Sequence, residues 1–268
     1  MKKFLYSLRA DLLFSEPVSN HTFVLRSVPL SEPGQEPMRI SLTCQPGCRL
    51  SETFDGQGNK VFLGSIENKH TFFSFCSTGE VLVDSSQRSS FGAAAYYRYP
   101  TQLTTLTGTL KDYFEANKVE GAPIALAEYW LTKIGTDFRY QKGVTTTVTA
   151  AHEAWELGAG VCQDFAHILL AFLRAQNVIC RYVAGLTTGE GASHAWVEVF
   201  DGETWIGVDP THQRFCDDNY VKISQGPDFS FCALERGVFM GAAAFAWPLA
   251  VYRKQRVFIV YCVDYQGI

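Results

Sequence analysis

The feature that most constrains this chain is the order of a helix and a hairpin in its second half. Residues 162–174 carry apolar side chains at helical spacing, and this stretch begins with Cys162. Residues 194–200 and 204–208 are rich in strand-forming side chains, and Asp201-Gly202 between them is a strong hairpin signal. This order predicts a helix that packs against antiparallel strands.

The hairpin also predicts which polar side chains lie close together. If Asp201 and Gly202 alone form the turn, Phe200 pairs with Glu203 and His194 lies opposite Asp209. Opposite residues of an antiparallel pair have Cβ atoms about 4.5–5.5 Å apart on the same face. A symmetric four-residue turn is expected to keep this register, whereas a three-residue turn would place the two side chains on opposite faces.

Cys162 is predicted to lie at the N-terminus of the helix over residues 162–174. Unpaired backbone N–H groups and the helix dipole favour a thiolate there, and a nearby imidazolium favours it further. With His194 and Asp209, the thiol forms a Cys-His-Asp set, in which the carboxylate orients the imidazole and the imidazole takes the proton of the nucleophile. The backbone N–H of Cys162 is also placed to donate to an oxyanion.

Each of these residues also has an ordinary structural explanation. A lone cysteine on an apolar helix is usually a buried core thiol. His194 and Asp209 could be a structural pair, and Asp209 before Pro210 could simply begin a turn. Catalysis is favoured because all three structural explanations would otherwise have to hold at once.

Four segments resemble the transglutaminase-like superfamily. They are Gly-Val-Cys-Gln-Asp-Phe-Ala-His at 160–167, Arg-Tyr-Val-Ala-Gly at 181–185, Ser-His-Ala-Trp-Val-Glu-Val at 193–199 and Gly-Val-Asp-Pro-Thr at 207–211. The similarity is greatest to the bacterial transglutaminase-like cysteine proteases. It implies Cys162 as nucleophile, His194 as general base and acid, and Asp209 as the residue that orients His194. One departure is His212, where many relatives carry asparagine; it adds a titratable group near the site.

Weaker similarities extend the resemblance over most of the chain. Phe-Arg-Tyr at 138–140 resembles a segment before the catalytic helix, and 226–230 resembles a segment after the hairpin. Asp-Gly-Gln-Gly-Asn at 55–59 resembles the β-rich region that precedes the catalytic domain in these proteins. The resemblance implies a papain-like, transglutaminase-like catalytic domain, with helices packed on an antiparallel sheet, preceded by an N-terminal β-sandwich.

The predicted organisation agrees with an α+β fold class. Residues 1–88 alternate short apolar runs with turn residues, as is typical of a β-sandwich domain. Residues 89–120 are predicted to be a linker, and 121–268 the catalytic domain. The expected strands are 4–14, 23–28, 39–44, 60–66, 70–76, 80–83, 179–185, 194–200, 204–208, 245–252 and 256–264, and the expected helices are 109–117, 124–134, 148–157 and 162–174.

Three further residues are candidates for the walls of a substrate groove: Gln163, Trp196 and Tyr140. Gln163 could donate into the cleft or lie on the helix surface. Trp196 shares a strand face with His194, and it is as consistent with packing as with a groove wall. The loop over 187–193 is expected to supply more groove residues.

Other groups near the site are expected to have structural roles. Asp164, in the first turn of the helix, interacts favourably with the helix dipole in this interpretation, and catalysis is the minority role. His167 lies five positions after Cys162, off its face, and is expected to be a hydrogen-bonded core or boundary group. Cys180 is expected to be a core residue.

Composition limits the partners and the location. A net charge of −4 and a pI near 5.9 give no reason to expect nucleic acid. Arg9 and Asp11 interrupt the apolar start, so a signal peptide is not expected, and no apolar stretch is long enough to span a bilayer. The eight cysteines are scattered, with only Cys44 and Cys48 close together. We therefore expect a cytoplasmic protein with no disulfide framework, no metal, no cofactor and no membrane partner.

The chemistry that these residues favour is acyl transfer through a thioester, with a peptide or protein as substrate. Water as the acceptor makes the enzyme a cysteine protease or amidase, whereas a lysine-type amine makes it a transglutaminase. Hydrolysis is favoured because the resemblance is to the protease-like branch. A third hypothesis, a non-catalytic binding module on the same fold, is disfavoured because all three members of the Cys-His-Asp set are present. The sequence predicts no oligomeric state.

Overall fold

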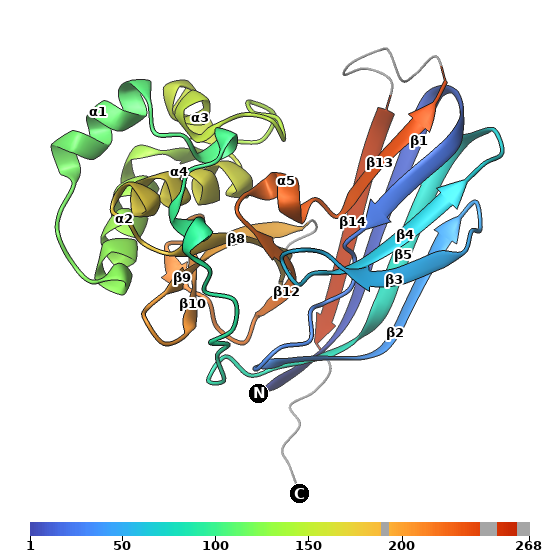
Figure 1. The fold of residues 1–268 in the computed structure, drawn as a ribbon, viewed down its shortest axis with the longest axis horizontal. Helices are drawn as coiled ribbons and strands as arrows, with labels where there is room; N and C mark the ends of the chain where they lie inside the picture. Colours follow the sequence, from blue (N-terminus) through green and yellow to red (C-terminus); the bar gives the residue numbers. More distant parts are fainter. Residues whose placement is uncertain (189–192, 242–250, 262–268) are drawn as a thin grey trace, which may run out of the picture.

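A computed structural model describes residues 1–188, 193–241 and, as backbone alone, 251–261. These residues form two parts that lie side by side, one made of strands and the other of helices on a sheet (Figure 1). The predicted α+β fold class is therefore confirmed.

The strand-rich part is built around one long strand, β1 (Lys2–Leu25). In the first half of β1, every second side chain is buried, beginning with Phe4, Tyr6 and Leu8, and the side chains between them are at least partly exposed. Because successive side chains of a strand point to opposite faces, this alternation gives β1 one apolar face.

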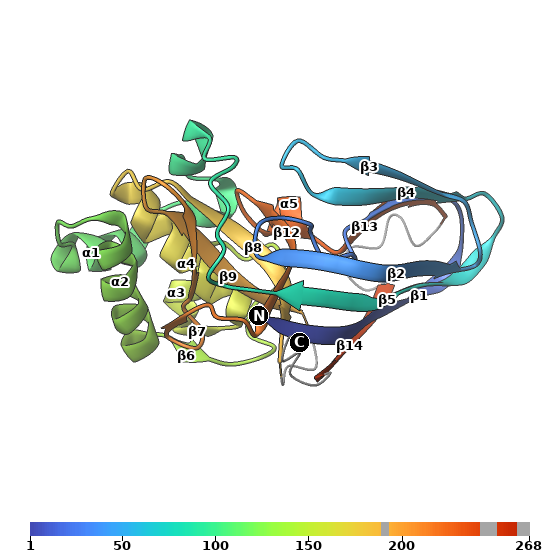
Figure 2. The same cartoon turned by 90° about the horizontal axis from the view of Figure 1, so that it is seen from below.

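Two sheets branch from β1 and enclose a common core (Figure 2). The first half of β1 pairs with β5, which pairs with β2, and its second half pairs with β4, which pairs with β3. The bounds of these strands are β2 (Gln35–Gln45), β3 (Leu50–Phe54), β4 (Lys60–Ile66) and β5 (His70–Val83). Buried side chains of both sheets belong to one apolar cluster, as in the predicted sandwich.

Two strands from the C-terminal end of the chain return to β1. β13 (Glu235–Met240) pairs with its second half, and β14 (Val251–Tyr261) with its first half. The domain boundaries at 1–88, 89–120 and 121–268 stay a prediction, but this pairing places the end of the predicted catalytic domain in the N-terminal sheets. Of the two strands predicted there, 256–264 overlaps β14, while most of 245–252 lies outside the described residues.

The second part packs helices on a five-stranded sheet with the order β11-β10-β9-β8-β12 (Figure 1). Its strands are β8 (Cys180–Thr187), β9 (His194–Phe200), β10 (Trp205–Asp209), β11 (Arg214–Phe215) and β12 (Tyr220–Gly226), and its helices are α1 (Gly108–Asn117), α2 (Pro123–Asp137), α3 (Ala151–Leu157), α4 (Cys162–Ala175) and α5 (Phe229–Cys232). α4 lies between the sheet and the other helices, so nearly its whole length is buried. Within the described ranges, no helix has the length and apolar character needed to cross a membrane.

The segment predicted to be a linker is packed rather than extended. It contains the 3-10 helices η1 (Ala95–Arg98) and η2 (Gln102–Thr104), as well as α1. Arg174, near the end of α4, donates to the carbonyl of Tyr97 at 3.1 Å and to the hydroxyl of Thr104 at 2.8 Å. These buried hydrogen bonds attach the segment to α4.

The β9–β10 hairpin has a longer turn than predicted. Four residues form it, with the N–H of Asp201 donating to the carbonyl of Thr204, and Phe200 pairs with Trp205 instead of Glu203. The carboxylate of Asp201 accepts the N–H groups of Glu203 at 2.8 Å and Thr204 at 2.7 Å, which stabilises this turn.

The longer turn moves the register of the hairpin by two residues. The predicted pairing of Phe200 with Glu203, and with it the direct opposition of His194 and Asp209, was therefore wrong, because the four-residue turn is not centred on Asp201-Gly202. Since side chains alternate with a period of two, a shift of two leaves both residues on the same face. His194 and Asp209 are diagonal neighbours, close enough for their side chains to meet.

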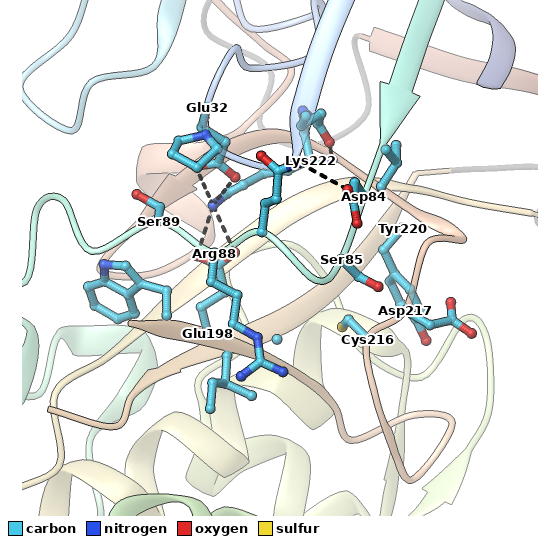
Figure 3. Close-up of a pocket in the computed structure, with 18 of the residues that line it drawn as sticks. Glu32, Asp84, Ser85, Arg88, Ser89, Glu198, Cys216, Asp217, Tyr220 and Lys222 are labelled. Atoms are coloured by element: carbon cyan, nitrogen blue, oxygen red, sulfur yellow. Dashed lines mark hydrogen bonds and ion pairs between the residues drawn. The ribbon is translucent and has the colours of Figure 1, made fainter. Parts of the chain in front are cut away.

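A buried charge cluster joins the two parts of the molecule. Lys222 on β12 binds the carboxylates of Glu32 and of Glu198 on β9, each at 2.7 Å (Figure 3). Arg181 on β8 also binds Glu198 at 2.7 Å, and its guanidinium stacks over the ring of Trp205 at 3.8 Å. Burial alone would raise the pKa of Glu198, but Lys222 and Arg181 hold it below its usual range. The cluster thus fixes the N-terminal part against the sheet that carries His194.

Candidate active site

Cys162 is the first residue of α4. α3 ends at Gly158, whose φ of +67° lies in the left-handed region that favours glycine, and the short β7 (Ala159–Gly160) then leads into α4. Because the first N–H groups of a helix have no acceptor within it, the half-buried thiol lies where negative charge is stabilised.

Asp164 holds the backbone that precedes Cys162. Its Oδ2 accepts the N–H of Val161 and the hydroxyl of Thr145, both at 2.7 Å. Burial raises the pKa of Asp164, and these two hydrogen bonds oppose the rise. A Cβ at position 160 would lie 2.4 Å from Oδ2, so the carboxylate can approach only because Gly160 has no side chain. Asp164 thus acts at the N-terminus of α4, where it was predicted to act.

His194 and Asp209 form the buried half of the site. Nε2 of His194 donates to Oδ2 of Asp209 at 2.7 Å, and both side chains are almost fully buried. The thiol of Cys162 is a second side-chain hydrogen-bond partner of His194. The structure therefore brings together the three residues that the sequence singled out, with the imidazole between the thiol and the carboxylate.

The surroundings of His194 favour its protonated form. Burial alone would lower the pKa of His194, but its hydrogen bonds to Asp209 and Cys162 outweigh this effect and raise the pKa to about 10. Burial would likewise raise the pKa of Asp209, yet the contact with His194 holds it well below its usual range. At neutral pH the site contains an imidazolium beside an ionised carboxylate.

Asp209 accepts hydrogen bonds from more groups than the predicted partner. Nδ1 of His212 and the hydroxyl of Tyr220 each donate to Oδ2 at 2.7 Å. Oδ1 accepts the backbone N–H groups of Thr211 at 2.9 Å and His212 at 3.2 Å. The orientation of the carboxylate, and through it that of His194, is thus fixed from several sides.

Sequence reasoning missed Tyr220 entirely and placed His212 only near the site. Tyr220 begins β12, which joins the sheet at the far side of β8, so the path from Asp209 to Tyr220 runs through an irregular segment. The sequence has no local signal for this contact. His212 was singled out only because it departs from the family pattern; its position three residues after Asp209 allows its backbone N–H to reach Oδ1.

Two of the three groove candidates lie next to Cys162. Tyr140, in β6 (Arg139–Tyr140), pairs with Gly160 in the short parallel ladder that leads to Cys162, and it is 48% exposed. Gln163 is buried, and its amide donates to the carbonyl of Thr147 at 3.2 Å. Tyr140 thus lies at the surface, next to the backbone that leads to Cys162, whereas the amide of Gln163 is engaged with the segment before α3.

The other predicted neighbours of the site are core groups. Trp196 is 2% exposed and packs against Val183 and Tyr220. Of its two predicted roles, packing and a groove wall, the structure shows packing. His167 is buried and accepts the N–H of Phe229 at 3.2 Å, and Cys180 is also buried, as predicted for both. The groove loop predicted over 187–193 lies largely outside the described residues.

Two segments of the chain match known families. Residues 110–210 match the transglutaminase-like superfamily, and residues 8–82 match the bacterial transglutaminase-like N-terminal region. The chain carries a transglutaminase-like domain. The segment matched to this domain contains Cys162, His194 and Asp209. The segment matched to the N-terminal region covers most of strands β1 to β5.

The chain has relatives in mycobacteria. An uncharacterized protein of Mycobacterium tuberculosis is 35% identical over 123 residues, which cover 40% of this chain and 39% of the relative. An uncharacterized protein of Mycobacterium leprae is 32% identical over 133 residues, 46% of each chain. The chain thus matches less than half the length of these relatives.

A solved structure resembles the chain over both of its parts. It is described as a putative cysteine protease from Cytophaga hutchinsonii, and it matches with a TM-score of 0.75 over 98% of this chain and 92% of that chain. At 21% sequence identity, this similarity shows a common fold. The folds of both parts therefore occur together in another protein.

Three residues of the transglutaminase-like domain could also bring metal ligands together. Among the described residues, His194, Asp209 and His212 form the group whose ligand atoms lie within 4.8 Å of one another. Nε2 of His194 and Nδ1 of His212 both donate to Oδ2 of Asp209, which accounts for their closeness without an ion. We assign these atoms to the hydrogen-bond network around Asp209, and the absence of a metal requirement stays a prediction.

We expect the ring of His194 to stay protonated at neutral pH and to titrate near pH 10. Because its pKa is raised above the unfolded value of about 6.5, its contribution to stability is complete below that pH and is lost as the pH rises through about 10. In the Cys162→Ala variant this pKa should fall, since one of the interactions that raise it is removed. Ring ¹⁵N chemical shifts followed through a pH titration measure both values, and a neutral wild-type ring at pH 7 would contradict the expectation.

Proposed function

We propose that this protein is a thiol-dependent acyl-transfer enzyme, a cysteine protease or amidase that cleaves peptide or isopeptide amides. The observation that carries this proposal is the buried imidazole of His194, hydrogen-bonded to the carboxylate of Asp209 on one side and to the thiol of Cys162 on the other. The transglutaminase-like domain and the description of the Cytophaga hutchinsonii protein support an enzyme.

In the first half of the proposed reaction, the sulfur of Cys162 attacks the carbonyl carbon of the substrate amide. The backbone N–H of Cys162, at the start of α4, donates to the oxygen that gains negative charge. His194 gives a proton to the leaving nitrogen as the C–N bond breaks, and a thioester remains on the sulfur. Asp209 holds the ring in the orientation that this transfer needs.

In the second half, an acceptor attacks the thioester, and His194 takes its proton. With water as the acceptor, the products are a carboxylic acid and the free thiol. With an amine, the product is a new amide, which is the transglutaminase reaction. The triad serves both, so the acceptor decides the reaction, and we favour water because of the resemblance to the protease-like branch.

The proposed substrate is a peptide or protein chain that passes over the N-terminus of α4. Tyr140 is exposed there, and its ring lies 6.3 Å from that of Phe165 on α4. An exposed tyrosine offers apolar area and a hydroxyl, both of which suit binding of an extended peptide backbone. We also propose a cytoplasmic location and no nucleic-acid or membrane partner, which the acidic pI near 5.9 supports in the case of nucleic acid.

The decisive experiment compares the two acceptors in one assay. Wild-type protein is incubated with a mixed peptide library, with and without a labelled primary amine, and the products are identified by mass spectrometry. Release of free amine and new carboxyl ends is the expected result. Incorporation of the label into glutamine-containing peptides would show a transglutaminase instead. If the wild type produces neither and Cys162 is no more reactive toward iodoacetamide than the other cysteines, the protein is a binding module.

A further inference from the structure

The carboxylate that orients His194 is shared with a second histidine. Oδ2 of Asp209 accepts Nε2 of His194, Nδ1 of His212 and the hydroxyl of Tyr220, all at 2.7 Å. A single oxygen thus faces three donors, and each of them competes for the same negative charge. The strength of the bond to His194 therefore depends on the other two donors.

The two histidines occupy different surroundings. The side chain of His194 is 2% exposed and that of His212 is 38% exposed, although their ring centroids lie only 5.0 Å apart. His212 follows β10 in the turn after Asp209, and its backbone N–H donates to Oδ1 at 3.2 Å. Asp209 therefore holds both the backbone and the ring of His212 in place beside His194.

We propose that His212 is a positioning residue that sets, through Asp209, the pH at which His194 loses its proton. This inference rests on the proposed acyl-transfer function, in which that proton goes to the leaving group. His212 acts through its hydrogen bond. Its Nδ1–H withdraws charge from the oxygen that stabilises the His194 imidazolium. This effect lowers the pKa of His194.

The remaining charged groups around Asp209 come from the neighbouring strands. Tyr220 reaches it from β12, and Nε of Arg214 on β11 donates to the Tyr220 hydroxyl at 3.0 Å, which turns the hydroxyl proton toward Asp209. Asp217 and Cys216, between β11 and β12, complete the set on this side, and Cys162 faces His194 from α4. None of these groups changes when position 212 alone is varied, so a shift in the His194 titration can be attributed to His212.

Two substitutions test the hydrogen bond of His212. In His212→Asn, the side-chain amide can place its N–H where Nδ1 lies, so the hydrogen bond to Asp209 is kept. In His212→Ala, it is lost. His152→Asn is the matched control, because His152 is a partly exposed histidine on α3, outside the Asp209 network.

The readouts are the ring ¹⁵N titration of His194 and the pH profile of Cys162 alkylation by iodoacetamide, with thermal unfolding as a check on the fold. We expect His212→Ala to raise the pKa of His194 by about one unit. We expect His212→Asn to keep the wild-type pKa of His194, because its amide keeps the hydrogen bond to Asp209. The His152→Asn variant should behave as wild type.

The outcomes separate this inference from the proposed function. If His212→Ala unfolds at a lower temperature but His194 titrates as in the wild type, the role of His212 is structural and the inference fails. A rise in the pKa of His194 in His212→Asn equal to that in His212→Ala would also overturn it. If Cys162 reacts no faster than the other thiols, the proposed function fails, while the NMR titration still decides whether His212 acts on His194.

Discussion

Replacing Cys162 by alanine should lower amide cleavage by roughly 10⁶-fold, while the protein stays folded. The expected loss is this large because the thioester cannot form without the sulfur, and no other described nucleophile lies against His194. The stability cost should be only about 1 kcal/mol, since the side chain is small and half-buried at a helix start. Peptide turnover and thermal unfolding measure the two effects.

The matched control is Cys76→Ala, which removes another half-buried thiol, on β5 in the N-terminal sheet. It should leave turnover unchanged. Cys162→Ser is a useful third variant, because it keeps the shape of the side chain but replaces a thiolate by a hydroxyl that the site does not ionise. Turnover by Cys162→Ala within about tenfold of the wild type would show that the sulfur is not the nucleophile.

The sequence was sufficient to predict the elements that carry the site. Strand β9 spans the predicted residues, and α4 begins at the predicted cysteine, because these segments have strong local patterns: an apolar stripe at helical spacing, and alternation bounded by turn residues. The roles of Cys162, His194 and Asp209 came from the resemblance to transglutaminase-like proteins. Secondary-structure propensity predicts where a helix or strand forms, but it does not predict which side chain is a nucleophile or a base.

The sequence was not sufficient to predict the register of the hairpin. The predicted Asp-Gly turn competes with a four-residue turn in which the carboxylate of Asp201 caps two N–H groups, and the second arrangement forms. The observed register differs from the predicted one by two residues. Because side chains alternate with a period of two, His194 and Asp209 still lie on the same face of the hairpin. A shift of one residue would have placed the imidazole and the carboxylate on opposite faces.

The sequence was also not sufficient to predict which strands pair when they lie far apart in the chain. β13 and β14 follow the transglutaminase-like domain in the chain but pair with β1, more than two hundred residues earlier. Tyr220 reaches Asp209 in a similar way, through the order of strands in the sheet. Neither contact has a local signal, because both depend on which strands become neighbours after folding.

Asp209→Asn should cause the second largest loss, roughly 10⁴-fold in kcat, because an amide at this position no longer selects the His194 tautomer that faces the thiol. The hydrogen bonds of Asp209 leave the new side chain no good orientation. If its NH₂ takes the place of Oδ2, it faces three donors, on His194, His212 and Tyr220. If it takes the place of Oδ1, it faces the backbone N–H groups of Thr211 and His212.

In either orientation, buried donors point at one another, so Asp209→Asn should also lower the free energy of unfolding by about 2–4 kcal/mol. The pKa of Asp209 is depressed, so its ionic stabilisation is present above the unfolded value of about 3.9 and is lost as the pH falls toward its folded value. The stability difference between wild type and variant should therefore shrink in acid. Asp84→Asn is the control, because that carboxylate accepts from Ser86 and Gln87, outside the Asp209 network. Urea unfolding at several pH values and peptide turnover measure both effects, and turnover within about tenfold of the wild type would show that Asp209 does not orient His194.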